Sequence, residues 1–88
     1  VISVINHAFP KTFSGMVRSA LQGDFASARS AHEQVLESAI AIFADGSPSG
    51  IKTMLNEMQL CGTTVRPPLW PVNDSVETNL RRLAKNAQ

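Results

Sequence analysis

The sequence has little cysteine and no long apolar run. Its single cysteine, Cys61, cannot form an internal disulfide, and no clustered cysteine and histidine spacing typical of zinc ligands occurs. No apolar stretch approaches the roughly 18 residues that a membrane-spanning helix needs, and the chain opens without the basic segment of a signal peptide. We therefore expect a reducing, cytoplasmic compartment, no metal site and no membrane contact.

Charge is also sparse. Charged residues make up 17% of the chain, the net charge is +1, and the lysines and arginines are scattered singly. This pattern lacks the basic stripe that follows a phosphate backbone, so we expect no nucleic-acid partner. The segment from Gly46 to Gly50 has the composition of a phosphate-binding loop, but Pro48 removes one of the backbone donors that such a loop uses. We expect no cofactor.

What is present suits one small domain. With 88 residues, of which 43% are hydrophobic, the chain can form a single core but not the deep, walled pocket of an enzyme. It opens with a β-branched apolar run, Val1–Ile5, in place of an initiating methionine. Such a run is typical of a buried parallel strand, which needs neighbouring strands. We interpret it as a strand cut from a sheet whose other strands lie upstream.

Apolar residues at spacings of three and four then predict a series of helices. Asn6 and Pro10 suit the start of a first helix that ends at Gly23, and Asp24 caps a second that ends at Asp45-Gly46. The predicted apolar faces are Phe9, Phe13, Met16, Val17, Ala20 and Leu21 in the first helix, and Phe25, Ala28, His32, Val35, Leu36, Ala39, Ile40 and Phe43 in the second.

Two more helices follow, with a proline-rich segment between them. Ser47-Pro48 starts a third helix, with Ile51, Leu55 and Met58 on its apolar face, that ends at Gly62. The segment from Thr63 to Asn73 is predicted to be extended. Asp74 and Glu77 have the spacing of a capping box for a last helix, whose apolar face is Val76, Leu80, Leu83, Ala84 and Ala87. The predicted fold class is all-α: a small antiparallel bundle of about four helices, preceded by one residual strand.

No set of nucleophile, base and orienting group can be assembled from these residues. His32 lies on an apolar face, where a half-buried structural histidine is the favoured interpretation. His7 and Asn6 follow the predicted strand, a position from which either could face a pocket, although helix capping is favoured for Asn6. Cys61 precedes a helix end, which does not activate a thiol, so we predict a structural thiol there.

The lysines and paired glutamates are also predicted to be structural. Lys11, Lys52 and Lys85 all fall on helices, whereas a lysine that forms a Schiff base needs a desolvated pocket. Glu33 and Glu37 mimic a pair of catalytic carboxylates, but they lie off the apolar face of their helix and should be solvated.

Four framework segments occur in order along the chain. They are Val1-Ile2-Ser3-Val4 followed by Asn6, Gly23-Asp24-Phe25 with Ala28-Arg29, Pro48-Ser49-Gly50-Ile51-Lys52, and Val65-Arg66-Pro67-Pro68-Leu69. In this order and spacing, the chain resembles the dihydrodipicolinate synthase and N-acetylneuraminate lyase family. The segments are similar to that family's eighth barrel strand, the turn between two C-terminal helices, a helix start, and the stretch before the last helix.

The resemblance implies a (β/α)8 barrel enzyme with a C-terminal helical domain, in which a lysine on strand six forms a Schiff base with pyruvate. Residues 1–7 would be the last barrel strand and its turn, and residues 8–88 the C-terminal helical domain. The family's catalytic lysine, pyruvate-binding threonines and proton-relay tyrosines lie upstream, so we expect no catalytic residue in this chain. Ile2 is carried over as the rim of the substrate pocket, and Ser3 and Asn6 would help to shape that rim.

The expected function follows from the resemblance. The full-length protein would condense pyruvate with aspartate semialdehyde in lysine biosynthesis, and this chain would be an inactive scaffold. Alternatives are a fragment of N-acetylneuraminate lyase or another keto-acid aldolase, or a stand-alone helical module that docks a partner helix. Because the first and last helices would expose apolar surface, we also expect a homo-oligomer, in which Val1–Ile5 pairs with another copy, joins the bundle or is disordered.

Overall fold

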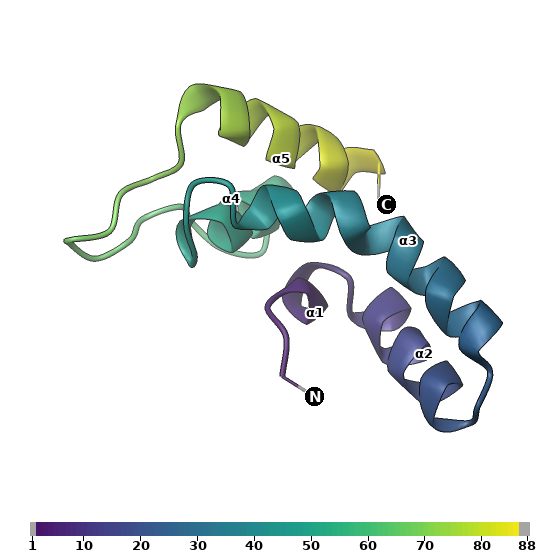
Figure 1. The fold of residues 1–88 in the computed structure, drawn as a ribbon. Coiled ribbons are helices and arrows are strands. Elements are labelled where there is room, and N and C mark those ends of the chain that lie inside the picture. The colour runs from purple at the N-terminus through teal and green to yellow at the C-terminus, as the bar shows by residue number, and fades with distance from the viewer. Residues whose placement is uncertain (1, 87–88) are drawn as a thin grey trace.

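The computed structural model describes residues 2–86 and contains five helices in that range. They are α1 (Ile5–Ala8), α2 (Pro10–Leu21), α3 (Phe25–Ile42), α4 (Ser49–Glu57) and α5 (Asp74–Asn86). The molecule measures 42 × 23 × 21 Å, and α3 runs along much of its length (Figure 1). Helix α3 contacts each of the other four helices, so it is the centre of the bundle. The predicted all-α bundle is confirmed.

The strand predicted over Val1–Ile5 is not formed in the part of it that the structure describes. Residues 2–4 have no regular secondary structure, α1 begins at Ile5, and Val1 lies outside the described range. A strand is held by hydrogen bonds to a neighbouring strand, and residues 2–86 supply no second strand. Instead, Ile5 and Ala8 are buried in the helical core. Of the three expected arrangements of this segment, joining the bundle is the one observed for Ile5.

Helices α2 and α3 form a hairpin at one end of the molecule, with a turn at residues 22–24 (Figure 1). Helix α2 ends at Leu21, and Gly23 follows in the turn with a φ of +84°, which glycine adopts without strain. Asp24 then caps α3, because its Oδ1 accepts a hydrogen bond from the backbone N–H of Ser27 at 3.1 Å. The cap predicted at Asp24 is confirmed. The cap predicted at Asn6 is wrong, since Asn6 lies inside α1 and no side chain caps α1 or α2.

The buried face of α3 is only partly the predicted one. Ala28 and Val35 are buried as expected, together with Ser38, Ala41 and Ile42. Five residues of the predicted face are exposed instead: Phe25, His32, Leu36, Ile40 and Phe43. Helix α3 therefore has two apolar faces, of which one packs on the core and the other faces solvent.

Helix α4 crosses the end of α3 at very short range. An added Cβ on Gly50 would lie 1.9 Å from the backbone oxygen of Ile42, so only glycine fits there. The predicted start at Ser47-Pro48 is close to the observed one, but no side chain caps the helix. The predicted end at Gly62 is wrong: α4 ends at Glu57, and Gln59 adopts a φ of +63°. A periodic pattern that continued through Met58 concealed this earlier end.

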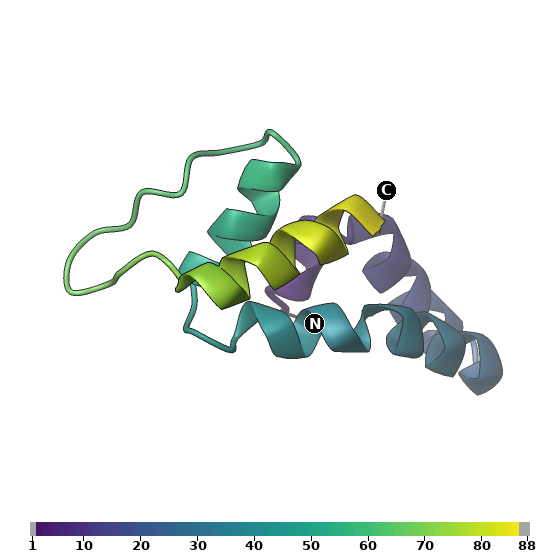
Figure 2. The same cartoon turned by 90° about the horizontal axis from the view of Figure 1, so that it is seen from above.

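Residues 58–73 cross from α4 to α5 without a helix or strand, as the prolines predicted for the segment from Thr63 onward (Figure 2). The segment is fixed near its end, where Ser49 Oγ donates to the carbonyl of Trp70 and the backbone N–H of Asn73 donates to Asp45 Oδ2. Asn73 then caps α5, because its Oδ1 accepts from the N–H of Val76 at 3.0 Å. The cap is thus one residue earlier than the predicted Asp74.

The core lies where α1, α4, α5 and the C-terminal half of α3 meet. Its fully buried large side chains are Ile42, Met54 and Leu80, one each from α3, α4 and α5. In α5 the predicted face is confirmed for Val76, Leu80, Leu83 and Ala84, whereas Ala87 lies outside the described residues. Helix α2 contributes no buried residue. The core therefore stabilises one end of the molecule and leaves the α2–α3 end thinly packed.

Candidate functional site

The N-terminal segment holds the residues that the sequence pointed to as a pocket rim. Ile2 is fully exposed, Ser3 is half-buried, and Asn6 and His7 are exposed on α1. No hydrogen bond joins these side chains to one another within the described part of the chain. The structure places them on one short stretch but does not gather them around a pocket.

The lysines lack the environment that amine catalysis requires. Lys11 is exposed, the side chain of Lys85 is 70% exposed beside Glu57, and Lys52 donates to the carbonyl oxygen of Thr64. A lysine nucleophile is activated above all by desolvation in an apolar pocket. The exposure of Lys11 and Lys85, and the carbonyl contact of Lys52, do not provide this setting. That these lysines are not catalytic stays a prediction.

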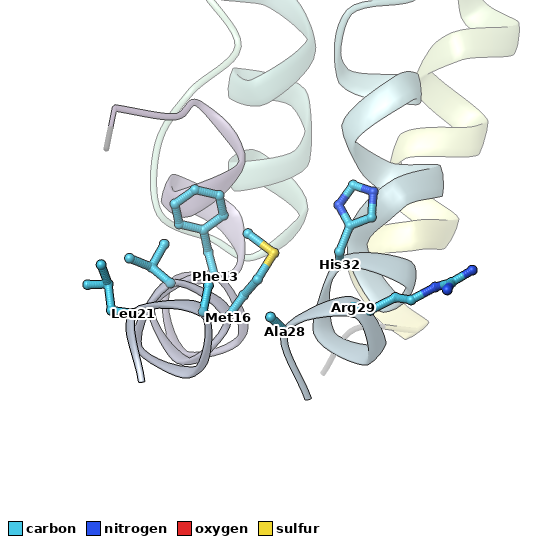
Figure 3. A pocket seen from close by; sticks show the side chains of 8 residues that line it. Phe13, Met16, Leu21, Ala28, Arg29 and His32 are labelled. Atoms are coloured by element: carbon cyan, nitrogen blue, oxygen red, sulfur yellow. The ribbon is translucent and has the colours of Figure 1, made fainter. Parts of the chain in front are cut away.

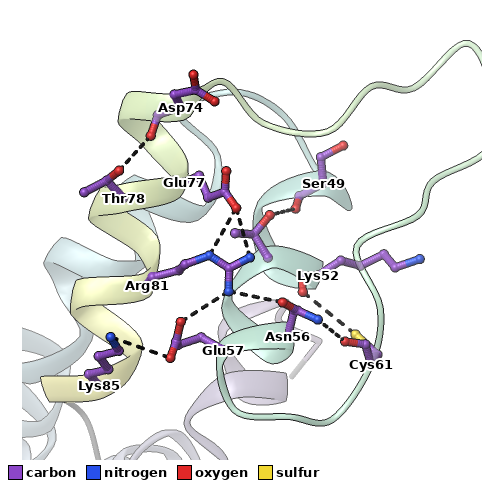
Figure 4. A network of polar contacts seen from close by, with 11 residues as sticks. Ser49, Lys52, Asn56, Glu57, Cys61, Asp74, Glu77, Thr78, Arg81 and Lys85 are labelled. Atoms are coloured by element: carbon purple, nitrogen blue, oxygen red, sulfur yellow. Dashed lines mark hydrogen bonds and ion pairs between the residues drawn. The ribbon is translucent and has the colours of Figure 1, made fainter.

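A network of polar contacts surrounds Arg81 on α5 (Figure 4). Its guanidinium donates to Glu77 on the same helix at 2.9 Å, and to Asn56 and Glu57 on α4 at 3.1 and 3.2 Å. The hydrogen bond to Glu77 is the main reason that the pKa of Arg81 is raised, with Glu57 acting in the same direction.

Asn56 extends this cluster toward the segment that follows α4. Its Nδ2 donates to the carbonyl of Cys61 at 2.9 Å, and the Cys61 thiol lies 3.8 Å from the carbonyl of Lys52 (Figure 4). Every group in the cluster is already satisfied by a neighbour within the bundle. The cluster therefore joins α4 to α5 and to the following segment.

An apolar groove lies between α2 and α3 (Figure 3). It has a volume of about 520 Å³ and is lined by Phe13, Met16, Val17, Ala20, Leu21, Ala28, Arg29 and His32. Several of these residues were predicted to lie on buried helix faces, so the sequence did not indicate a groove. The only signal was that two apolar faces, one on each helix, meet at the Gly23 turn.

The remaining candidates have structural or solvated surroundings. His32 is exposed at the edge of the groove, so its predicted half-burial is wrong. Glu33 and Glu37 are 62% and 69% exposed in their side chains, and they pair with Arg29 and Arg82. Their prediction as a solvated face is confirmed. Cys61 is exposed, although its thiol contacts the backbone as described above.

The described part of the chain has neither a metal-binding cluster nor a helix suited to a membrane. Residues 2–86 contain no group of three or more histidine, cysteine, aspartate or glutamate side chains placed to hold a metal ion. None of the helices in this range combines the length and apolar character that crossing a bilayer requires.

Comparison with a family model identifies what this architecture is similar to. Residues 1–87 match the model described as the dihydrodipicolinate synthetase family. The match includes all five helices and the segment between α4 and α5. It therefore extends over the whole of the described structure and is not confined to one motif.

Individual relatives agree with the family model. The chain is 46% identical over 83 residues to 4-hydroxy-tetrahydrodipicolinate synthase of Phocaeicola vulgatus, a match that covers 94% of this chain and 28% of the relative. It is 44% identical over 85 residues to the same enzyme of Parabacteroides distasonis, covering 97% of this chain and 29% of the relative. The chain thus spans less than a third of the length of these curated relatives.

A solved structure shares the fold. A crystal structure of dihydrodipicolinate synthase superimposes with a TM-score of 0.92 at 35% sequence identity, covering 98% of this chain and 30% of that chain. The five helices therefore have the arrangement of one portion of a chain about three times as long.

Proposed function

The chain belongs to the dihydrodipicolinate synthetase family, and on that premise we propose that it is the C-terminal helical portion of a pyruvate-dependent aldolase. The whole enzyme would condense pyruvate with aspartate semialdehyde to supply lysine biosynthesis. In it, this portion has a scaffold role: it supports the barrel that carries the reactive lysine and performs no chemical step. We also propose a cytoplasmic location for the whole enzyme and self-association of the isolated chain into a homo-oligomer.

The observation that carries this proposal is the close superposition of nearly the whole chain on less than a third of a dihydrodipicolinate synthase. The chemistry of the described residues supports it, since Lys11, Lys52 and Lys85 have no desolvated pocket. The relatives cited above are named 4-hydroxy-tetrahydrodipicolinate synthase. Their names favour this reaction over that of N-acetylneuraminate lyase.

Within the whole enzyme, we assign residues 1–7 to the last barrel strand and its turn, and residues 8–88 to the helical domain. The apolar, β-branched composition of residues 1–5 supports the strand, which requires partner strands that residues 2–86 do not contain. Ile2 would then border the substrate pocket. Its fully exposed side chain is free to take that position once a barrel surrounds it.

Trapping of the Schiff base tests the proposed division of labour. The amino-terminal part of the Phocaeicola vulgatus enzyme is joined to this chain, so that the fusion has a full-length arrangement. Treatment with pyruvate and borohydride should add a reduced pyruvyl group to the fusion, because reduction converts the imine to a stable secondary amine. The isolated chain should gain no mass under the same conditions.

Peptide mapping provides the control for this experiment. In the fusion, the adduct should map to a lysine upstream of Val1, and replacing Lys52 by arginine should leave trapping unchanged. An adduct on Lys11, Lys52 or Lys85 of the isolated chain would contradict the scaffold role.

A further inference from the structure

We propose that a pocket between the start of α4 and the segment that follows this helix binds a small organic acid. The pocket has a volume of about 410 Å³, which is in the range of small-molecule sites, and is lined by Pro48, Lys52, Thr64, Val65, Arg66 and Leu69. A carboxylate of the acid would bind the two cations, and its carbon chain would contact the apolar lining. The site goes beyond the proposed function and does not depend on it.

Two side chains of α4 hold the wall of the pocket in place. Ser49 Oγ donates to the carbonyl of Trp70, and Lys52 Nζ donates to the carbonyl of Thr64. The rest of the lining from the following segment lies between these two attachment points. Figure 4 shows the Lys52 side chain extending from α4 away from the Arg81 network. The pocket is therefore formed without a ligand, so binding does not have to order its wall.

The lining carries two positive charges and no carboxylate. In the described part of the chain no carboxylate pairs with Lys52 or Arg66, whereas four other basic residues each pair with a glutamate. An ammonium has three donors, of which Lys52 uses one on Thr64, and the guanidinium of the exposed Arg66 has five. These remaining donors favour an anionic ligand.

The other lining residues favour a carboxylic acid with a carbon chain over a bare phosphate. Pro48 has no N–H, whereas phosphate-binding loops use successive backbone N–H groups. Its ring, with the side chains of Val65 and Leu69, offers apolar contact instead. A turn closed by the hydrogen bond from the Leu69 N–H to the Arg66 carbonyl, at 2.9 Å, keeps this apolar wall next to a guanidinium that fits a carboxylate. Glutarate, a dicarboxylate with a short methylene chain, is therefore the probe.

Titration of this chain with sodium glutarate at constant ionic strength, followed by amide NMR, tests the site. The largest shifts should come from residues 64–69 and from Lys52, and those of α2 should be small. Inorganic phosphate should bind at least about fivefold more weakly, because it makes no apolar contact. Shifts distributed over all the basic residues, or equal affinities for the two anions, would overturn the proposal.

Substitution of Arg66 measures the contribution of the charge. Arg66 is exposed, so the fold should tolerate Arg66→Gln, and glutarate should bind at least about tenfold more weakly because a charge-assisted contact is lost. Arg66→Lys, which keeps the charge but not the planar fork, should have an intermediate effect. Arg18→Gln removes another exposed cation, on α2, and should change the affinity less than about twofold. Equal effects of Arg66→Gln and Arg18→Gln would mean that net charge alone attracts the acid, which contradicts the site.

Substitution of Leu69 separates the apolar contact from the charge. Leu69 lines the pocket and is 41% exposed. Leu69→Ser should weaken glutarate binding at least about threefold and leave phosphate binding unchanged, because only the carbon chain loses a contact. Leu60→Ser is the matched control, since Leu60 precedes the pocket residues of the same segment and is 68% exposed. A loss of glutarate binding in Leu60→Ser as large as in Leu69→Ser would refute the assigned pocket.

Arginine modification extends the test to the fusion described above. Phenylglyoxal reacts with exposed guanidinium groups, and peptide mapping distinguishes Arg66 from Arg18. Glutarate well above its Kd should slow the modification of Arg66 at least about fivefold, in this chain and in the fusion, and leave that of Arg18 unchanged. Reaction of Arg66 at the same rate with and without glutarate, in either protein, would overturn the proposal. Pyruvate trapping on the fusion reports the proposed function separately.

Discussion

At Gly50 the backbone of α4 lies directly against Ile42, the last residue of α3. A methyl group there would overlap the backbone oxygen of Ile42, and backbone cannot move aside as a flexible side chain can. We expect Gly50→Ala to lower the free energy of unfolding by about 2–4 kcal/mol, measured by urea denaturation with circular dichroism.

Gly15 provides the matched control. It lies inside α2, and nothing is within 4 Å of the position that its Cβ would take. Gly15→Ala should therefore raise the free energy of unfolding by about 0.5–1 kcal/mol, since alanine has the higher helix propensity. If both substitutions had the same effect, the close contact between α3 and α4 would not be what makes Gly50 necessary.

Asp24 gives the structure a pH-dependent helix cap. Ser27 lowers the pKa of Asp24 below 3.8, chiefly through its side chain and also through its backbone N–H. Because the folded-state pKa is the lower one, this contribution to stability is present above the unfolded-state pKa and is lost as the pH falls through the folded-state pKa. Asp24→Asn keeps an oxygen acceptor at the cap but does not titrate.

The measurement for Asp24 is the difference in melting temperature between the wild type and Asp24→Asn, taken at about pH 6 and again at about pH 2. The wild type should have the higher melting temperature at the higher pH, where the negative charge of the Asp24 carboxylate also interacts favourably with the positive N-terminal end of α3. This difference should disappear at the lower pH. Asp24→Ala should be less stable than Asp24→Asn at both values. A constant difference between wild type and Asp24→Asn would contradict the assigned pKa shift.

Capping shows how far sequence reasoning reaches for single residues. Asp24 was identified correctly, because a glycine precedes it and an apolar periodic stretch follows. Asp74 and Asn73 are both good capping residues, and the structure uses Asn73, whose backbone N–H is also held by Asp45, 28 positions earlier in the chain. The choice between two adjacent caps depends on such a distant contact, which local spacing does not contain.

At the scale of elements, the pairing of α4 with α5 depends on Arg81. Its side chain is 29% exposed and joins Glu77 on α5 to Glu57 on α4. Arg81→Met keeps the apolar stem but leaves Glu57, whose side chain is 22% exposed, with only Lys85 at 3.9 Å. We expect a loss of about 1–2 kcal/mol in the free energy of unfolding, measured by chemical denaturation.

An exposed ion pair on α3 is the control for Arg81. Arg29 and Glu33 are 82% and 62% exposed in their side chains, so Arg29→Met should change the free energy of unfolding by at most about 0.5 kcal/mol. Equal losses for Arg81→Met and Arg29→Met would mean that the α4–α5 cluster adds no more than an ordinary surface pair.

The helices themselves were largely predictable, but their environments were not. Periodicity located α2, α3 and α5 closely, since each has a strong apolar pattern and a clear start signal. It could not divide the apolar residues of α3 between two faces: Val35 packs on the core, whereas the adjacent Leu36 is 42% exposed. A hydrophobic pattern indicates which residues are apolar, but it does not indicate which other element packs against them. The same limit hid the groove beside α2.

At the scale of the whole molecule, the uncovered apolar surface should drive self-association of the isolated chain. Leu21 borders the open groove, while Ile40 and Phe43 on the outer face of α3 are 67% and 54% exposed. Such patches are typical of surfaces that bind other proteins. We expect sedimentation velocity to show oligomers whose proportion rises with protein concentration.

Charged substitutions identify the surface responsible for self-association. Ile40→Lys, on the outer face of α3, should shift the equilibrium toward monomer, whereas Arg18→Lys, at an exposed charged position of α2, should not. A monomer at every concentration for the unsubstituted chain would refute the expected self-association.

The segment between α4 and α5 gives the molecule a native optical reporter. Trp70 is the only tryptophan, the chain has no tyrosine, and the indole is 80% exposed although its backbone carbonyl is anchored by Ser49. Its fluorescence therefore originates from one known place on the surface. Binding of another protein surface to this segment would remove the indole from water and shift its emission to shorter wavelength. Assembly could therefore be followed in the unlabelled protein.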